Sequence, residues 1–414
     1  MVAPASRPHP MAPAPSDLPQ TEAPAGSVGE VFSAFLKLGL TAFGGPVAHI
    51  GYFRTEFVAR RRWLDEAAYA DLVALCQFLP GPASSQVGLG LGLMRAGPLG
   101  ALAAFTAFTL PSVLILMAFA YGLTMAGGLG GGWLHGLKAV TVAVVAQAVF
   151  GMARNLAPDG ARATLLVAAA LVALAFPGSI GQVSTILLGA VIGLFLPGDT
   201  APAQTGGRRT RLSRRLGAAA LALYGVLLVA LPLLATAFPT QSLQLADAFY
   251  RAGALVFGGG HVVLPLLQAA IVPKGWMSAD TFLAGYGAAQ AVPGPLFTFA
   301  AYLGAAMGPE PNGWRGALLC LGFIFLPAIL LVFGALPFWE VLRRGVRARR
   351  MLSGVNAAVV GLLLAALYDP VWTSGIRGPA DAGLAASAYL ALAVWQLPPW
   401  SVVIGGALVG AMLG

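Results

Sequence analysis

The chain has 414 residues, of which 58% are apolar and only 9% are charged, and its mean hydropathy is +0.81. Soluble domains carry about 25% charged residues, so this composition excludes a soluble domain and predicts a membrane protein. The net charge of +9 lies mainly in a few arginine clusters, which is typical of cytoplasmic loops and not of a nucleic-acid-binding face.

Residues 1–27 are rich in Pro, Ala and Ser and contain no long apolar run. We expect a disordered cytoplasmic tail, and neither a signal peptide nor a lipidation site. Cys76 and Cys320 both lie in apolar segments, and no Cys/His spacing of the zinc type occurs. We therefore expect buried free thiols, no metal site and no cofactor.

Two helix breaks interrupt the first apolar segments. Residues 28–43 predict a helix that stops at Gly44-Gly45-Pro46, and the limbs 67–79 and 84–94 flank Pro80-Gly81-Pro82. Each limb is shorter than the ~20 residues that a spanning helix needs. Because proline lacks an N–H and clashes with the preceding turn, such a break leaves backbone groups unpaired, which is tolerated at membrane depth only beside protein or water.

The rest of the first half contains one long span and several short apolar segments. Residues 98–125 are long enough to cross a bilayer, and apolar segments follow at 137–152, 164–176 and 183–196. The basic stretch 199–215 then precedes a single span at 216–238. We divide the chain into the tail 1–27, a first transmembrane repeat 28–197, a basic cytoplasmic linker with a connecting helix 198–244, and a second repeat 245–414.

From residue 245 the pattern of the first half starts again. At an offset of 214 residues, Phe43-Gly44-Gly45 matches Phe257-Gly258-Gly259. At an offset of 213, Trp63 matches Trp276 and Pro80-Gly81-Pro82 matches Pro293-Gly294-Pro295. Because these matches keep their order over most of each half, they indicate an internal duplication.

The basic loops predict that the two halves are inverted. The first half has Arg60–Arg62 before its long span and no Lys or Arg in residues 126–136 after it. The second half has only Lys274 in the equivalent first loop, whereas five arginines (Arg343, Arg344, Arg347, Arg349, Arg350) follow its long span. Basic loops face the cytoplasm, so we expect an all-α polytopic protein of two inverted repeats with broken or re-entrant helices, a cytoplasmic N-terminus and a periplasmic C-terminus.

The breaks are the candidate substrate site, because the exposed N–H groups and positive dipole of a broken helix bind anions. Each glycine or hydroxyl taken singly suits helix packing or capping equally well, but paired sets at two breaks favour binding. The candidates in the first half are Gly44, Gly45, Pro46, Gln77, Pro80, Gly81, Pro82, Ser84 and Ser85. Those in the second half are Gly258, Gly259, Gly260, Gln290, Pro293, Gly294, Pro295 and Thr298.

Charged and titratable residues in the apolar segments extend this site. Lys37 and Arg251 occupy equivalent positions, and two such cations suit a dianion, although both could instead reach the headgroups from helix ends. His49, Asp71 and His261 are candidate proton carriers. Repeat symmetry gives no support to Asp71, which aligns with an alanine.

The strings FLKLGLTAFGGPVAHI and QFLPGPASSQ, with FYRAGALVFGGG and GYGAAQAVPGP in the second half, resemble the chromate ion transporter family in its long, two-domain form. The resemblance implies a secondary transporter in the cytoplasmic membrane that exports chromate and confers chromate resistance, with sulfate as a competing dianion. Lipid is the other expected partner, nucleic acid is not, and a homodimer is compatible with the sequence. A sulfate carrier, a passive anion channel and, less favoured, an intramembrane enzyme with Asp71 or a histidine as base stay open.

Overall fold

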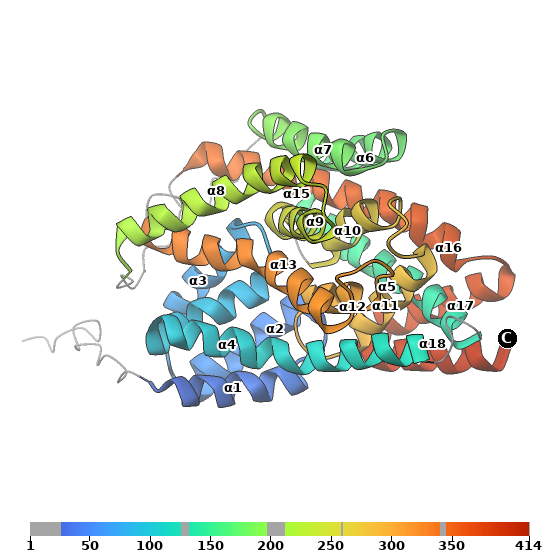
Figure 1. Cartoon of the computed structure of the whole chain (residues 1–414), viewed down its shortest axis with the longest axis horizontal. Helices are drawn as coiled ribbons and strands as arrows, with labels where there is room; N and C mark the ends of the chain where they lie inside the picture. Colours follow the sequence, from blue (N-terminus) through green and yellow to red (C-terminus); the bar gives the residue numbers. More distant parts are fainter. Residues whose placement is uncertain (1–25, 126–131, 197–211, 258–259, 340–344, 414) are drawn as a thin grey trace, which may run out of the picture.

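The computed structural model describes residues 26–125, 132–196, 212–257, 260–339 and 345–413, and every regular element in these ranges is a helix (Figure 1). The predicted tail up to residue 25, most of the basic linker, Gly258, Gly259, Arg343 and Arg344 lie outside the described residues. The long apolar helices confirm the predicted all-α fold of a polytopic membrane protein.

Five helices in the described ranges are long and apolar enough to cross a bilayer: α4 (Ala83–Met125), α5 (Gly132–Leu156), α8 (Arg214–Ala237), α13 (Gly313–Ala335) with the turn η5 (Leu336–Phe338), and α15 (Val346–Ala366) with its continuation through η6 (Leu367–Trp372) and α16 (Thr373–Gly375). α4 turns back on itself at Gly97, which has φ +67°. Its two limbs pack so closely that a Cβ on Gly92 would lie 2.4 Å from the Gly100 carbonyl oxygen. Only the limb 98–125 therefore crosses.

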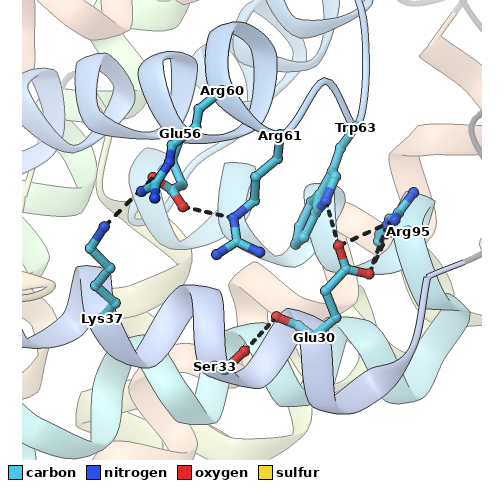
Figure 2. A network of polar contacts seen from close by, with 8 residues as sticks. All are labelled: Glu30, Ser33, Lys37, Glu56, Arg60, Arg61, Trp63 and Arg95. Carbon is cyan, nitrogen blue, oxygen red and sulfur yellow. Dashed lines mark hydrogen bonds and ion pairs between the residues drawn. The ribbon is translucent and has the colours of Figure 1, made fainter.

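The limbs before this crossing form two hairpins: α1 (Val28–Thr41) with α2 (Gly45–Phe53) and the π-helix η2 (Arg54–Arg60), and α3 (Glu66–Phe78) with the first limb of α4. The ends of these two hairpins that lie away from the helix breaks contact each other. Trp63 Nε1, after η2, donates to Glu30 Oε1 on α1 at 2.9 Å, and Arg95, at the end of the first α4 limb, pairs with Glu30 at 3.1 Å (Figure 2). Each hairpin thus returns to the face at which it began.

We call this end of the molecule the arginine-rich face, because Arg60–Arg62 and Arg95 lie there. Arg162 Nε on α6 (Gly160–Ala175) donates to Ser353 Oγ on α15 at 2.6 Å, which brings the α5–α6 turn and the start of α15 to one face. Trp339, just after η5, donates to Asp71 on α3 at 2.8 Å. The end of α13 therefore lies on the arginine-rich face as well.

The second repeat has the same hairpins at the opposite end: α9 (Gln241–Leu255) with η3 (Gly260–Val262) and α10 (Val263–Ile271), then α11 (Ala279–Ala291) with η4 (Leu296–Thr298) and α12 (Phe299–Ala306). The Gly308 N–H donates to the Trp276 carbonyl at 3.1 Å, and these residues are the repeat equivalents of Arg95 and Trp63. Asp280 on α11 pairs with Lys138 near the start of α5 at 2.6 Å. The second set of hairpins therefore enters from the face opposite to the first, so the repeats are inverted.

Each repeat ends in a helical hairpin that packs on the long helix of the other repeat. α18 (Pro399–Leu413), which follows α17 (Pro379–Ala393), packs on α5, and α7 (Ser179–Gly193) packs with α6 on α15. A Cβ on Gly136 would lie 2.1 Å from the Gly406 carbonyl oxygen, and one on Gly354 would lie 2.1 Å from that of Gly189. Glycine is needed at these contacts because the backbones touch. α18 ends beside the start of α5, where Gly410 packs on Gly136, so the C-terminal end of the chain lies on the opposite face.

Candidate functional site

The glycine turn of the first repeat separates α1 from α2. Gly44 has φ +97°, in the left-handed region that glycine adopts without a steric penalty. Pro46 lies in the first turn of α2, where a missing N–H costs no hydrogen bond. The sequence thus ends one helix and begins the next within three residues, and the turn itself has few internal hydrogen bonds.

The two Pro-Gly-Pro breaks have the same local geometry. α3 ends at Phe78 and α11 at Ala291, and the next residue of each chain segment is extended. Gly81 then has φ +116° and its equivalent Gly294 has φ +103°. Because both prolines lack an N–H, the glycine supplies the one N–H of each Pro-Gly-Pro unit.

These two glycine N–H groups join the repeats. The Gly81 N–H donates to the Val256 carbonyl at 2.6 Å, and the Gly294 N–H donates to the Ala42 carbonyl at 3.0 Å. Val256 and Ala42 are themselves equivalent, each ending the helix before a glycine turn. Each Pro-Gly-Pro break therefore meets the glycine turn of the opposite repeat, and the four breaks form one centre.

The crossing helices of the opposite repeat close around the breaks. A Cβ on Gly81 would lie 3.4 Å from Ala328 Cβ on α13, and a Cβ on Gly294 would lie 2.9 Å from Ser112 Oγ on α4. Backbone from one repeat thus fills space between helices of the other. The positive φ disfavours a side chain at both glycines, and at Gly294 the close approach of Ser112 adds to this effect.

Polar side chains surround the first Pro-Gly-Pro break. Gln86, which is fully buried, donates from Nε2 to the Pro80 carbonyl at 2.7 Å and so satisfies the broken backbone. His49 Nε2 lies 3.1 Å from the Ala42 carbonyl and Nδ1 lies 3.3 Å from Ser84 Oγ. Since a carbonyl only accepts, Nε2 carries the proton and Nδ1 accepts from the Ser84 hydroxyl. The hydroxyl of buried Ser85 has no hydrogen-bond partner among the described residues.

Different polar groups surround the second break. Thr298 donates from Oγ1 to the Pro295 carbonyl at 2.7 Å, and His261 Nδ1 lies 2.8 Å from the Tyr286 hydroxyl on α11. Gln290 is the next-to-last residue of α11, as Gln77 is of α3. Gln86 and Tyr286 are not among the predicted site residues, although Gln86 is recognisable in the sequence as an amide in the apolar limb directly after a break.

The predicted cations each lie beside an acidic side chain. Lys37 Nζ is 3.9 Å from Glu56 Oε2, and its side chain is half exposed (Figure 2). Arg251 forms an ion pair with Asp247 one turn earlier on α9, and it lines a small cavity with Gln182 of α7. Asp71 lies near Trp339 on the arginine-rich face and not at the breaks. The structure therefore gathers the breaks, Ser84, Ser85 and His49, and it leaves Lys37, Arg251 and Asp71 outside this group of contacts.

Glu56 holds the basic residues of the first hairpin together. Its carboxylate accepts from Arg61 Nε at 2.7 Å and from Arg60 Nη1 at 3.2 Å, and it faces Lys37 (Figure 2). Burial raises the pKa of this carboxyl, but Arg61, Arg60 and Lys37 outweigh burial and hold the pKa below its ordinary value.

We expect Glu56→Gln to lower the free energy of unfolding by about 1–2 kcal/mol, because it removes the shared acceptor of charge-assisted hydrogen bonds. In the unsubstituted protein this stabilisation is present at neutral pH and is lost as the pH falls through the lowered folded pKa of Glu56. Thermal unfolding in detergent measures both effects. Glu66→Gln is the control, because Glu66 and its partner Arg54 are both exposed; equal shifts for the two variants would contradict this role of Glu56.

The described residues contain no group of three or more His, Cys, Asp and Glu side chains that could hold a metal ion. What the centre offers is hydroxyl, amide and imidazole groups beside helix ends. The N-terminus of α4 begins directly after Pro82, with Ser84 and Ser85 in its first turn. Such a set of donors suits an anion.

Related proteins are similar to this chain in sequence over both repeats. The sequence model of the chromate transporter family matches residues 29–194 and 243–411. A chromate transport protein of Pseudomonas aeruginosa is 31% identical over 360 residues, which cover 85% of this chain and 83% of that protein. A chromate transport protein of Cupriavidus metallidurans is 25% identical over 394 residues, 94% of each chain.

A probable chromate transport protein of Synechococcus elongatus is 29% identical over 351 residues, 83% of this chain and 84% of its own length. No solved structure matches the chain significantly. The family match spans both inverted repeats and includes all four breaks that meet at the centre. This multi-pass membrane protein belongs to the chromate transporter family.

Proposed function

We propose that the protein exports chromate, as an intact tetrahedral dianion, through the centre where the four breaks meet. The observation that carries this proposal is the reciprocal pair of hydrogen bonds, Gly81 to Val256 and Gly294 to Ala42, which joins broken helices from opposite faces. Broken helices at a repeat interface are where secondary transporters bind their substrates. The donors for the anion are the first turn of α4 and the Ser85 hydroxyl.

The direction of transport follows from orientation and voltage. Arginines concentrate on one face, which we assign to the cytoplasm. A dianion leaving a negative interior gains about 2.3 kcal/mol per charge for each 100 mV, so the membrane potential alone can drive export. The sequence contains no GxxxxGK[ST] motif for ATP. Proton coupling through His49 or His261, and chromate resistance of the host cell, belong to the same proposal.

A reporter protein fused after Gly414 is expected to be periplasmic, and one inserted in the linker 199–215 is expected to be cytoplasmic. The physical reason is the excess of arginine on the face that bears Arg95 and Arg162, together with the end of α18 on the other face. Alkaline phosphatase and green fluorescent protein fusions measure the two sides. A cytoplasmic C-terminus would contradict the assigned orientation.

Chromate uptake into everted membrane vesicles, with sulfate as competitor, tests the substrate and the direction. We expect uptake that saturates and depends on the imposed potential, and the Lys37→Ala, Arg251→Ala double variant tests the two predicted cations, which lie beside Glu56 and Asp247. Unchanged uptake in that variant would remove both cations from the mechanism. Sulfate moving as fast as chromate would favour a general oxyanion carrier, and uptake without saturation would favour a channel.

A further inference from the structure

Equivalent faces of α3 and α11 lie in different surroundings. On α3, four residues at helical spacing, Ala67, Ala70, Ala74 and Gln77, are all exposed and form one stripe. The opposite side of α3, with Leu72 and its neighbours, packs on the first repeat. The stripe runs from the arginine-rich face to Gln77, the next-to-last residue of α3 before the Pro-Gly-Pro break.

The equivalent stripe on α11 is covered. Leu283 and Gly287, the counterparts of Ala70 and Ala74, are buried, and a Cβ on Gly287 would lie 2.9 Å from Thr141 Oγ1 on α5. Ala284 is fully buried in one cluster with Leu137 of α5 and with residues of α18. α11 thus packs on α5 and α18, whereas α3 has no comparable packing on their counterparts α15 and α7 within the described ranges.

The exposed stripe of α3 does not suit contact with lipid. Lipid-facing positions in this protein are large and apolar, as on α8, where Leu223, Val226, Val229 and Leu233 are exposed. The α3 stripe instead consists of alanines and an amide, and an amide facing hydrocarbon is costly. An exposed stripe of this composition suits contact with water on the side of α3 that runs to the arginine-rich face.

On the opposite face an ion pair holds α11 against α5. Lys138 has a side chain only 4% exposed, and its Nζ lies 2.6 Å from Asp280 Oδ1 at the start of α11. Arg377 approaches the other carboxylate oxygen at 3.8 Å. A buried lysine needs such a partner, so the contact stabilises the packed position of α11 and opposes its departure.

We propose that the structure is the state open to the arginine-rich face, in which α11 packed on α5 and α18 closes the opposite face and the Lys138–Asp280 pair latches it. In the alternate state the α3 stripe packs on α15 and α7, and the α11 stripe leaves α5 and α18. The inverted repeats make these two packings equivalent by symmetry. The inference rests on the transport function proposed above. It adds two gates, which are the packing of α11 on α5 and α18 and the packing of α3 on α15 and α7, and one latch.

The surface that would receive α3 is already present on α15. The contacts of Gly136 with Gly406 and of Gly354 with Gly189 align α5 with α15, and this alignment sets Asn356 opposite Lys138, the residue that pairs with Asp280 of α11. The Asn356 Oδ1 is buried and has no hydrogen-bond partner among the described residues. We assign this amide to the contact with α3 in the alternate state.

Cysteine accessibility tests the gates without any substrate. The full chain is labelled in detergent with a charged maleimide, and Ala70→Cys on α3 is compared with Ala284→Cys on α11, both small changes. The native Cys76 and Cys320 are fully buried, and the unsubstituted chain gives the background. We expect Ala70→Cys to react at least about tenfold faster than Ala284→Cys, and equal rates would overturn the assignment of the state.

The latch is tested by adding Lys138→Met, which removes the buried partner of the half-exposed Asp280 carboxylate and leaves Arg377 beside it. We expect labelling of Ala284→Cys to rise about tenfold and labelling of Ala70→Cys to fall, because the population shifts to the alternate state. The exchanged pair, Lys138→Asp with Asp280→Lys, should restore the original rates. No change in either rate would refute the latch. A chain with the expected labelling but no chromate flux would refute the proposed function and leave the gates standing.

Discussion

Valine in place of Gly81 or Gly294 is expected to abolish chromate transport. Both glycines have φ above +100°, a conformation that costs a branched residue about 2 kcal/mol or more. The new Cβ would also lie 3.0 Å from Gln86 Nε2 at Gly81, or 2.9 Å from Ser112 Oγ at Gly294. Either break would have to move, and its N–H would leave the carbonyl of the opposite repeat. Flux per folded protein in vesicles measures the loss.

Gly178→Val is the matched control for this experiment. Gly178 has φ +114°, close to that of Gly81, but it lies at the turn between α6 and α7, and a Cβ there would have no neighbouring atom within 4 Å. We expect the variant to lose stability through the same backbone strain and to keep its flux per folded molecule. If all three variants lost flux to the same degree, strain alone would explain the effect and the junction of the breaks would have no special role.

Leucine at Gly406 is expected to separate α18 from α5 and to prevent accumulation of folded protein. A Cβ there would lie 2.0 Å from Val140 Cγ2 and 3.3 Å from Val140 Cβ, so the whole β-branched side chain, which the close helix contact holds in place, would have to move. Overpacking of a tight contact costs about 1–3 kcal/mol, and a leucine at this position adds further atoms beyond the colliding Cβ. The amount of monodisperse protein extracted in mild detergent, and its thermal midpoint, measure the effect.

Gly405, the adjacent residue on the same helix, provides the control. A Cβ on Gly405 would have no neighbouring atom within 4 Å. Gly405→Leu should fold normally. Gly189→Leu, at the equivalent contact between α7 and α15, should behave like Gly406→Leu, because the two contacts are related by the repeat. A well-folded Gly406→Leu protein would show that α18 is not held by this glycine contact.

Much of the architecture could be predicted from local sequence. The turn of α4 at Gly97 and the ends of α3 and α11 before their prolines follow from backbone chemistry that acts within a few residues. The short limbs beside each break left full spans and re-entrant hairpins open, and contacts such as Trp63 with Glu30 agree with re-entrant hairpins. The turn and the helix ends need no knowledge of distant neighbours.

The partners of the charged residues could not be predicted in this way. Repeat symmetry pairs Lys37 with Arg251, and both were expected to face the anion. The structure places Lys37 beside Glu56 and Arg251 beside Asp247, and these acidic residues are not equivalent to one another. Ion pairs depend on which side chains converge in space, and residues on a hairpin or a neighbouring turn compete with any substrate for each cation. Their part in transport stays a prediction.

The sequence by itself determined that this protein crosses the membrane, that it is built from two related halves and that both halves break their helices at glycine and proline. Those properties depend on hydropathy, on repeated order and on the chemistry of single residues. Only the tertiary structure decided that Gly81 meets Val256 and that Gly294 meets Ala42. The reason is that a broken helix takes its hydrogen-bond partners from whatever backbone packs against it, and here that backbone belongs to the opposite repeat. For the same reason the sequence did not predict that a face of α3 is exposed while α11 packs on α5 and α18.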